Sequence, residues 1–122
     1  MAHFAEIDSN NKVIRVLTLD DQYQNDGQNY LSNVLGLGGT WIQTSYNTLG
    51  GQNLNGGTPL NMNYAGVGFT WDSNKPGFYA PQPFPSWVLN QNTYLWEAPI
   101  VYPNDGQKYN WDESSKSWVG VS

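Results

Sequence analysis

Residues 111–118, Trp-Asp-Glu-Ser-Ser-Lys-Ser-Trp, are the clearest copy of a pattern that occurs four times in this chain. Each copy has a large apolar residue, then Asp or Asn, then a polar turn, and a second large apolar residue seven positions after the first. Repetition is informative because it shows how a chain is built before any single residue is interpreted. The other copies are Ile7-Asp8 to Ile14, Trp71-Asp72 to Phe78, and Leu89-Asn90 to Trp96.

This pattern is typical of a β-hairpin. Two large residues seven positions apart can face each other across the two strands. An Asp or Asn at the end of the first strand can accept hydrogen bonds from N–H groups of the turn. The sequence therefore predicts a mainly β fold of consecutive antiparallel hairpins. They are expected at 3–8 with 12–19, 64–72 with 77–79, 86–90 with 94–98, and 108–112 with 117–121.

The first half of the chain also predicts one short helix and one long loop. The helix is expected near residues 26–35, with Asp26 as its N-cap and Gly36 as its C-terminal stop. A strand at 41–46 follows, and then residues 47–63 are almost all Asn, Gly, Gln, Thr and Leu. We expect a flexible loop at about 47–63 in a single domain that covers residues 1–122. The apolar helix face is expected to consist of Tyr30, Leu31, Val34 and Leu35.

The composition narrows the classes of function. The 122 residues include no cysteine, which excludes disulfides and thiolate metal sites. The formal net charge is −5 and the cations are scattered, so the sequence has no basic stripe for nucleic acid. No apolar run is long enough to span a membrane, and the first residues lack the regions of a signal peptide. We therefore expect a soluble protein with no cofactor, no metal site and no nucleic-acid or membrane partner.

No arrangement of residues predicts catalysis. His3 is the single histidine and lies near the terminus, which disfavours a Ser-His or Cys-His nucleophile. An acidic cluster at residues 20–26 lacks the spacing of an EF-hand loop. Glycoside hydrolysis needs two converging carboxyl groups, but capping of turns already accounts for two of the candidates. We expect a non-enzymatic protein, and the carboxylates considered for such a pair are Asp72, Glu97, Asp112 and Glu113.

The tryptophans of the hairpins have two interpretations. Aromatic faces stack on sugar rings while Asn, Asp and Gln bind hydroxyl groups, which is what a carbohydrate-binding surface needs. Alternatively, the indole rings fill the core of a small sheet that has little Leu or Ile, and the composition favours this interpretation. The candidate glycan-binding residues are Trp87, Trp96, Trp111 and Trp118.

The loop at 47–63 is the segment that we expect to order against a partner. Its composition offers no core of its own, and yet it interrupts two strands. The candidate partner-binding residues in and beside this loop are Trp41, Tyr46, Leu49, Asn53, Leu54, Asn55 and Leu60.

Several longer stretches, taken together, are specific enough to indicate a resemblance to a protein family. They are 1–5, 41–47, 63–72, 85–90, 96–99, 102–106, 111–112 and 117–119. With them, the whole chain resembles a family of small proteins encoded by tailed phages of marine bacteria, cyanophages in particular. That family has no settled activity, so the resemblance implies a phage origin more firmly than a role. The stretch after Asn47 is longer than in those relatives, and Asn61-Met62 replaces basic residues.

These observations lead to a hypothesis and an alternative. The hypothesis is a non-enzymatic structural or accessory protein of a phage particle, which acts by protein–protein binding in capsid decoration or in a tail or fibre. Its partners would be phage structural proteins or further copies of itself, in the virion or in the host cytoplasm during infection. The alternative is a carbohydrate-binding module that contacts host glycans through exposed Trp, Asn and Asp.

Overall fold

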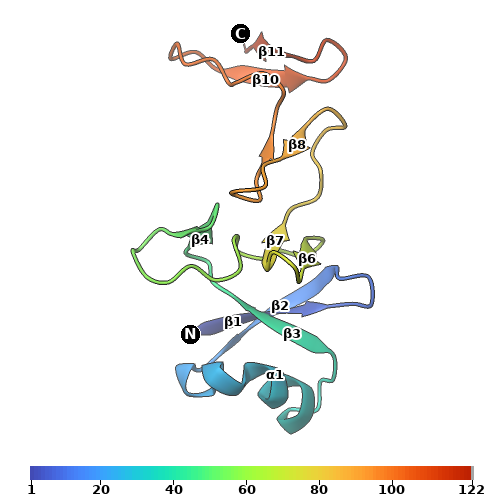
Figure 1. Ribbon diagram of the computed structural model, residues 1–122, viewed down its shortest axis with the longest axis vertical. Helices are drawn as coiled ribbons and strands as arrows, with labels where there is room; N and C mark the ends of the chain where they lie inside the picture. Colours follow the sequence, from blue (N-terminus) through green and yellow to red (C-terminus); the bar gives the residue numbers. More distant parts are fainter. Residues whose placement is uncertain (122) are drawn as a thin grey trace.

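The fold is built on a three-stranded antiparallel sheet. The computed structural model describes residues 1–121. The strand order is β2–β1–β3, with β1 at Ala2–Ile7, β2 at Val13–Leu19 and β3 at Thr40–Thr44. The central strand β1 crosses the wide end of the molecule (Figure 1). The mainly β class and the first hairpin that the sequence predicts are confirmed.

A helical segment connects β2 to β3 and lies along one side of the sheet (Figure 1). The short helix predicted near residues 26–35 is present, and Asp26 occupies the N-cap position of its α-helical turn but makes no capping hydrogen bond through its side chain. Helical structure begins earlier, and the N-cap of the whole segment is Asp20, whose carboxylate accepts a hydrogen bond from the N–H of Gln22 at 3.1 Å. The segment consists of the 3-10 turn η1 (Asp21–Asp26), the α-helical turn α1 (Gly27–Asn29) and the π-helical turn η2 (Tyr30–Val34).

Only part of the predicted apolar helix face is buried. Leu31 enters the core, and Tyr30 stacks on Tyr23 with ring centroids 3.9 Å apart. Val34 and Leu35 are exposed instead. The segment is short and ends before Gly36, which has a left-handed φ of 73°.

The core consists of one apolar cluster on each face of the sheet. The cluster on the helix side contains Ala2, Phe4, Leu19, Leu31 and Trp41. The cluster on the other side contains Ala5, Ile7, Val13, Ala65 and Phe78. Alternate residues of β1 contribute to opposite clusters, as the two-residue period of a strand requires. The central strand is therefore buried on both faces.

Four two-stranded ribbons follow the sheet along the chain. Three of them have the cross-strand pairs that the repeated pattern predicts: Trp71 with Phe78, Leu89 with Trp96, and Trp111 with Trp118. The strands are β4 (Thr48–Leu49), β5 (Gln52–Asn53), β6 (Thr70–Asp72), β7 (Gly77–Tyr79), β8 (Val88–Leu89), β9 (Trp96–Glu97), β10 (Tyr109–Asp112) and β11 (Ser117–Gly120).

Two predicted details of the hairpins are wrong. In the first hairpin the register shifts after Glu6, so that Ile7 pairs with Val13, while Ile14 is exposed. In the second hairpin, the strand predicted at 64–72 is reduced to β6. Residues 64–69 pack as an irregular segment, because Ala65 is anchored through its N–H to Thr44 Oγ1 at 2.9 Å.

The Asx turns are confirmed at three of the four hairpins. Asp8 Oδ1 accepts hydrogen bonds from two turn N–H groups, and Asp72 Oδ1 accepts one from Asn74 at 2.9 Å. Asn90 Oδ1 accepts the N–H groups of Asn92 and Thr93. Asp112 differs, since its carboxylate accepts the Ser115 hydroxyl instead. The repeated Asp or Asn therefore orders the turns.

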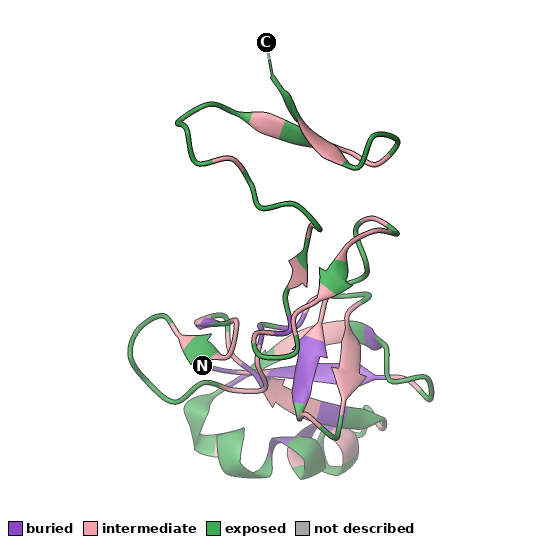
Figure 2. Ribbon diagram, turned by 45° about the horizontal axis from the view of Figure 1, so that its top comes forward, coloured by how far each residue is buried: buried purple, intermediate pink, exposed green. Residues whose placement is uncertain are grey.

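Burial decreases along the molecule from the sheet to the C-terminal hairpin. The ribbons extend from the sheet one after another, so the molecule is elongated (Figure 1). Buried residues concentrate at the wide end, and the last hairpin has none (Figure 2). Tyr94 is the last buried residue of the described chain. The end formed by β8–β9 and β10–β11, residues 86–121, is called the hairpin arm below.

Candidate binding surface

The base of the hairpin arm is held by one buried amide side chain. Asn63 is 3% exposed, and its Oδ1 accepts the N–H of Gly50 at 2.8 Å. Its Nδ2 lies 3.0 Å from the carbonyl oxygens of both Phe78 and Tyr94 and 3.3 Å from that of Thr93. Asn63 thus joins the β4–β5 turn, β7 and the β8–β9 turn.

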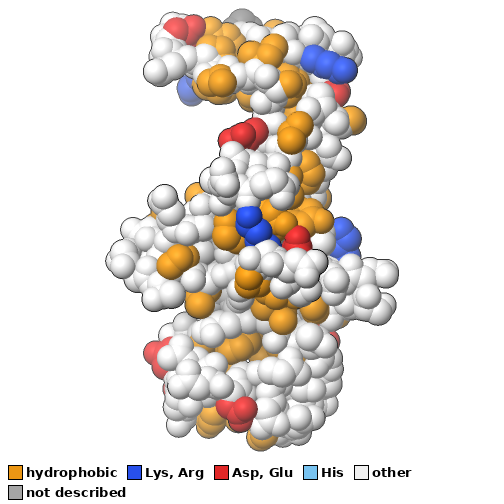
Figure 3. Space-filling model, viewed as in Figure 1, with side chains coloured by type: hydrophobic (Ala, Val, Ile, Leu, Met, Phe, Trp, Pro, Cys, Tyr) orange, Lys and Arg blue, Asp and Glu red, His pale blue; other side chains and the backbone are white. Residues whose placement is uncertain are grey.

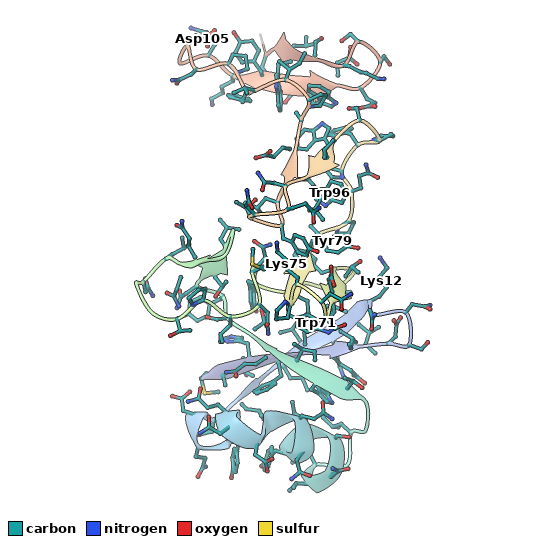
Figure 4. The ribbon with its side chains drawn as sticks, viewed as in Figure 1. Lys12, Trp71, Lys75, Tyr79, Trp96 and Asp105 are labelled. Atoms are coloured by element: carbon teal, nitrogen blue, oxygen red, sulfur yellow. The ribbon has the colours of Figure 1, made fainter. Side chains whose placement is uncertain are left out.

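The junction between β6–β7 and β8–β9 adds a carboxylate–tyrosine pair and an indole tether. The Tyr94 hydroxyl donates to Asp72 Oδ2 at 2.5 Å. This bond lowers the pKa of Asp72 and raises the pKa of Tyr94 to about 12. The Trp96 indole N–H donates to the Ala80 carbonyl at 2.7 Å, and Tyr79 and Trp96 make an edge contact (Figure 4).

The same junction includes a lysine. Lys75 Nζ lies 4.9 Å from the centroid of the Tyr94 ring and donates a hydrogen bond to the Gln91 carbonyl. An ammonium group over an aromatic face gains electrostatic attraction from the ring. Lys75 and Trp96 belong to neighbouring ribbons, which the structure brings close together (Figure 4).

The junction between β8–β9 and β10–β11 is an aromatic cluster. Trp87, Trp111 and Trp118 make edge contacts with centroids 5.1–6.0 Å apart, and Phe84 packs on Trp87. The Trp118 indole N–H donates to the Ile100 carbonyl at 2.7 Å. This bond repeats the tether of Trp96 to Ala80, because each indole binds a carbonyl just after the preceding ribbon.

Glu113 fastens the last hairpin to the preceding segment. Its Oε1 accepts hydrogen bonds from the Trp111 indole at 2.9 Å and from the Ser86 hydroxyl at 2.7 Å. These two bonds hold the pKa of the Glu113 carboxyl below its usual value. The carboxylate therefore acts as a structural acceptor.

Two cavities lie beside the two junctions. A groove of about 330 Å³ adjoins the outer junction, and a smaller apolar cavity of about 140 Å³ adjoins the inner one. The Leu49 side chain of the β4–β5 ribbon lines the inner cavity together with Leu95 and Trp96. Residues that line the outer groove are Trp87, Glu97, Ala98, Ile100, Val101, Tyr102 and Trp118.

The predicted partner-binding set is divided between the core and the surface. Trp41 is 2% exposed and packs in the core, so its side chain is not available to a partner in this structure. Sequence reasoning placed it beside the loop but could not show that its ring faces the helical segment. The other members are accessible to different degrees: Tyr46, Leu49, Leu54 and Asn55 are exposed, and Asn53 and Leu60 are half-buried.

The segment predicted as a loop at 47–63 contains secondary structure that the sequence did not reveal. It forms the ribbon β4–β5, and Thr48 at its start is buried. The Thr48 hydroxyl accepts the N–H of Leu60 at 3.1 Å, and the Thr48 carbonyl accepts the N–H of Tyr64 at 2.9 Å. Both ends of the segment are therefore held together, while its tip near Leu54 is exposed.

The predicted glycan-binding set is partly brought together. Trp87, Trp111 and Trp118 form the aromatic cluster, and two of these rings line the outer groove. Trp96 lies at the inner junction and lines the other cavity. All four side chains are half-buried, which is intermediate between a core role and an open platform.

Three surface residues that sequence reasoning missed lie next to the groove. Ile100, Val101 and Tyr102 are consecutive and exposed, in the connection between β9 and β10. A run of large apolar residues between Pro99 and Pro103 was the available signal. The space-filling view shows apolar atoms scattered along the arm and a deep notch below the last hairpin (Figure 3).

Other chemistry is limited in the part of the chain that the structure describes. Across residues 1–121, no helix has the length and apolar character needed to cross a membrane. The described side chains also contain no group of three His, Cys, Asp or Glu residues placed to hold a metal ion. The acidic residues near 20–26 serve other contacts, because Asp20 caps η1 and Asp21 pairs with the N-terminal amine at 2.8 Å.

Comparison with known proteins gives no further indication of function. No family model, curated protein or solved structure matches this chain.

Proposed function

We propose that this protein is a non-enzymatic structural or accessory component of a tailed-phage particle, and that it acts by binding other proteins. The observation that carries the proposal is the burial pattern of the hairpin arm. Residues 95–121 include no buried residue, and yet this segment carries several exposed large apolar side chains. Such surfaces on soluble proteins mark interaction sites. The phage assignment itself is supported only by the sequence resemblance.

The chemistry of the described carboxylates is consistent with a binding protein. Asp72 accepts a hydrogen bond from Tyr94 of the β8–β9 hairpin, and Glu113 accepts one from Ser86 in the segment before β8. Both carboxyl groups have lowered pKa values, so they are ionised at neutral pH. A general acid of a glycosidase needs the opposite shift. This chemistry supports a structural role for these two residues.

The test is quantitative mass spectrometry of gradient-purified particles from a phage that carries the gene. A copy number near that of the major capsid protein is expected for capsid decoration, and a few to a few dozen copies for a tail or fibre component. Absence from purified particles would refute the particle assignment. The control is a protein of the infected cell that is not part of the particle, quantified in the same gradient fraction, because its amount measures contamination.

A carbohydrate-binding module remains the second candidate, because three of its four candidate tryptophans meet beside one groove. The groove of about 330 Å³ has aromatic walls and the carboxylate of Glu97. Titration of host-surface oligosaccharides should then change the emission of Trp87 and Trp118. A Trp118→Phe variant separates their signals, and unchanged emission at saturating sugar would exclude this role.

A further inference from the structure

The connection between β9 and β10, residues 98–104, has unusual surface chemistry and is called the strap below. It has no helix or strand. Ile100, Val101 and Tyr102 are exposed by 49%, 87% and 46%. Three consecutive exposed apolar residues are rare on a soluble protein unless they serve binding. The strap runs along the outside of the arm and is exposed over most of its length (Figure 2).

The backbone N–H groups of the three apolar residues of the strap are also unpaired in the part of the chain that the structure describes. Within residues 1–121, no hydrogen bond is donated by the N–H groups of Ile100, Val101 or Tyr102. The Ile100 carbonyl accepts the Trp118 indole, which holds the strap beside the aromatic cluster. Ile, Val and Tyr have high strand propensity. The strap therefore has the residues and the free backbone groups of an edge strand.

A side-chain pocket lies next to this backbone. The groove of about 330 Å³ is lined by the strap itself and by Trp87, Glu97 and Trp118. Peptide recognition by strand addition uses this combination, in which backbone hydrogen bonds supply affinity and adjacent pockets select side chains. At the inner junction, the cavity beside Trp96 is lined in part by the Leu49 side chain of another ribbon, β4–β5.

We propose that the strap is a docking strand, which binds an extended segment of a partner polypeptide by β-pairing. The partner segment has an apolar centre, whose side chain enters the groove, and basic residues on both sides. This inference rests on the proposed function, since it specifies where and how the protein binds another protein. Pro99 and Pro103 lack N–H groups, which limits the pairing to the short run between them.

Charge decides between a partner protein and a second copy of this chain. In antiparallel self-pairing centred on Val101, residue 97 faces residue 105, because 97 and 105 lie four positions before and after the centre. Glu97 would then approach Asp105 of the other copy just beyond each end of the paired run. Like charges brought close together at both ends repel each other and disfavour this self-pairing. Basic residues at these two positions of the partner segment would instead complement both carboxylates.

The test is an NMR titration of the full chain with two synthetic peptides, both acetylated and amidated. One is Lys-Lys-Thr-Val-Ile-Val-Lys-Lys, and the other replaces every Lys with Glu. The Lys peptide should shift the amide signals of residues 98–104 and the indole signal of Trp118. It should bind at least about tenfold more tightly than the Glu peptide at low salt, and the difference should shrink as salt is added.

A matched pair of variants shows whether the strap carries the binding. Val101→Asp should abolish the shifts, while Val67→Asp should leave them unchanged. Val67 is a suitable control because it is 71% exposed in a different part of the molecule. Equal responses of the two variants, equal affinity for the two peptides, or no strap shifts at millimolar peptide would each overturn the proposal. So would concentration-dependent shifts of the strap without peptide, which would identify a second copy as the occupant.

The same variants separate this inference from the proposed function. Loss of particle association in Val101→Asp, but not in Val67→Asp, supports both. Association that survives in Val101→Asp overturns the docking strand and leaves the particle assignment standing. If the wild-type protein is absent from particles, the particle assignment fails, and the peptide titration still decides the role of the strap.

Discussion

At the scale of single residues, Asn63 has the greatest structural consequence. Its amide group is buried and bonded on both sides, to the Gly50 N–H and to carbonyl oxygens of Phe78, Thr93 and Tyr94. Only a side chain with both a donor and an acceptor satisfies these groups. A buried polar group that loses its partner costs about 1–3 kcal/mol.

Asn63→Asp should therefore destabilise the protein by about 2–4 kcal/mol, since a carboxylate cannot donate to the three carbonyl oxygens. The free energy of unfolding from urea denaturation measures the loss. Asn110→Asp is the matched control, because Asn110 is exposed. A loss below about 1 kcal/mol at neutral pH would show that the amide is not the connection that we describe.

Gly27 is a second residue for which the structure predicts a mutational effect on stability, and this effect is opposite to the usual one. Its φ of −59° is helical, so Gly→Ala would ordinarily stabilise this position by up to about 1 kcal/mol. An added Cβ would, however, lie 2.1 Å from Cζ of the Phe4 ring. We expect Gly27→Ala to lower the free energy of unfolding. A double-mutant cycle with Phe4→Leu should show positive coupling, and additive effects would contradict the steric explanation.

At the scale of elements, successive ribbons are joined by recurring types of contact. An indole of the second strand binds a backbone carbonyl just after the preceding ribbon, in Trp96 to Ala80 and in Trp118 to Ile100. A carboxylate also accepts a hydroxyl group from a neighbouring segment, in Asp72 with Tyr94 and in Glu113 with Ser86. The repeated sequence pattern thus produces repeated junctions as well as repeated hairpins.

The Asp72–Tyr94 pair predicts how the inner junction depends on pH. The lowered pKa of Asp72 means that its stabilising contribution is lost as pH falls below the ordinary Asp value, through the folded-state pKa. The pKa of Tyr94 is raised from 10.0 to about 12, so its contribution is lost as pH rises between those values. The junction should be most stable at pH values above the ordinary Asp pKa and below the ordinary Tyr pKa of 10.0.

Asp72→Asn should lower the pKa of Tyr94 toward its ordinary value, because a neutral acceptor favours the protonated phenol less than a carboxylate does. The ¹³Cζ shifts of the tyrosine rings, followed from neutral to alkaline pH, measure this change. Asp105→Asn is the control, since Asp105 accepts the hydroxyl of Tyr109 and should affect that ring alone. An unchanged Tyr94 titration in Asp72→Asn would contradict the assignment.

At the scale of the whole molecule, stability is expected to be unequal. Both apolar clusters lie around the three-stranded sheet, whereas the last hairpin has no buried residue. Regions with few buried apolar contacts open with a lower free energy than the core does. The hairpin arm can thus change its conformation when it binds a partner, while the three-stranded sheet stays folded.

Hydrogen exchange of the full chain should follow this gradient. Amides of β1 are expected to exchange most slowly and those of β10–β11 at least ~100-fold faster. Mass spectrometry of peptic fragments, or NMR, gives the rates. Equal protection of β1 and β11 would indicate that the arm and the sheet unfold as one unit. The Lys peptide described above should slow exchange in the strap.

Local patterns predicted the local elements well. Trp111 and Trp118 face each other as their spacing indicates, and the Asp or Asn at the strand end orders three of the turns. The first hairpin departs from the pattern because the register shift after Glu6 seats Val13, not Ile14, in the core. Asp26 makes no capping hydrogen bond through its side chain, because the helical segment already begins six residues earlier, after Asp20.

The candidate site was predicted only in part. Trp41 was placed beside the loop, and it is in the core, since a strand residue can face either side of a sheet. The convergence of Trp87, Trp111 and Trp118 could not be derived from spacing, because the connection between their ribbons is long and irregular. The strap was readable as Ile-Val-Tyr between prolines, but its exposure was not.

By itself, the sequence determined the class of fold, the positions of four hairpin turns and the absence of disulfides, because these depend on residue type and short-range spacing. The tertiary structure alone decided which side of each strand is buried, how Asn63 joins three ribbons, and that the strap lies beside a groove. The physical reason is that burial and junction contacts join residues far apart in the chain. No local period encodes that proximity.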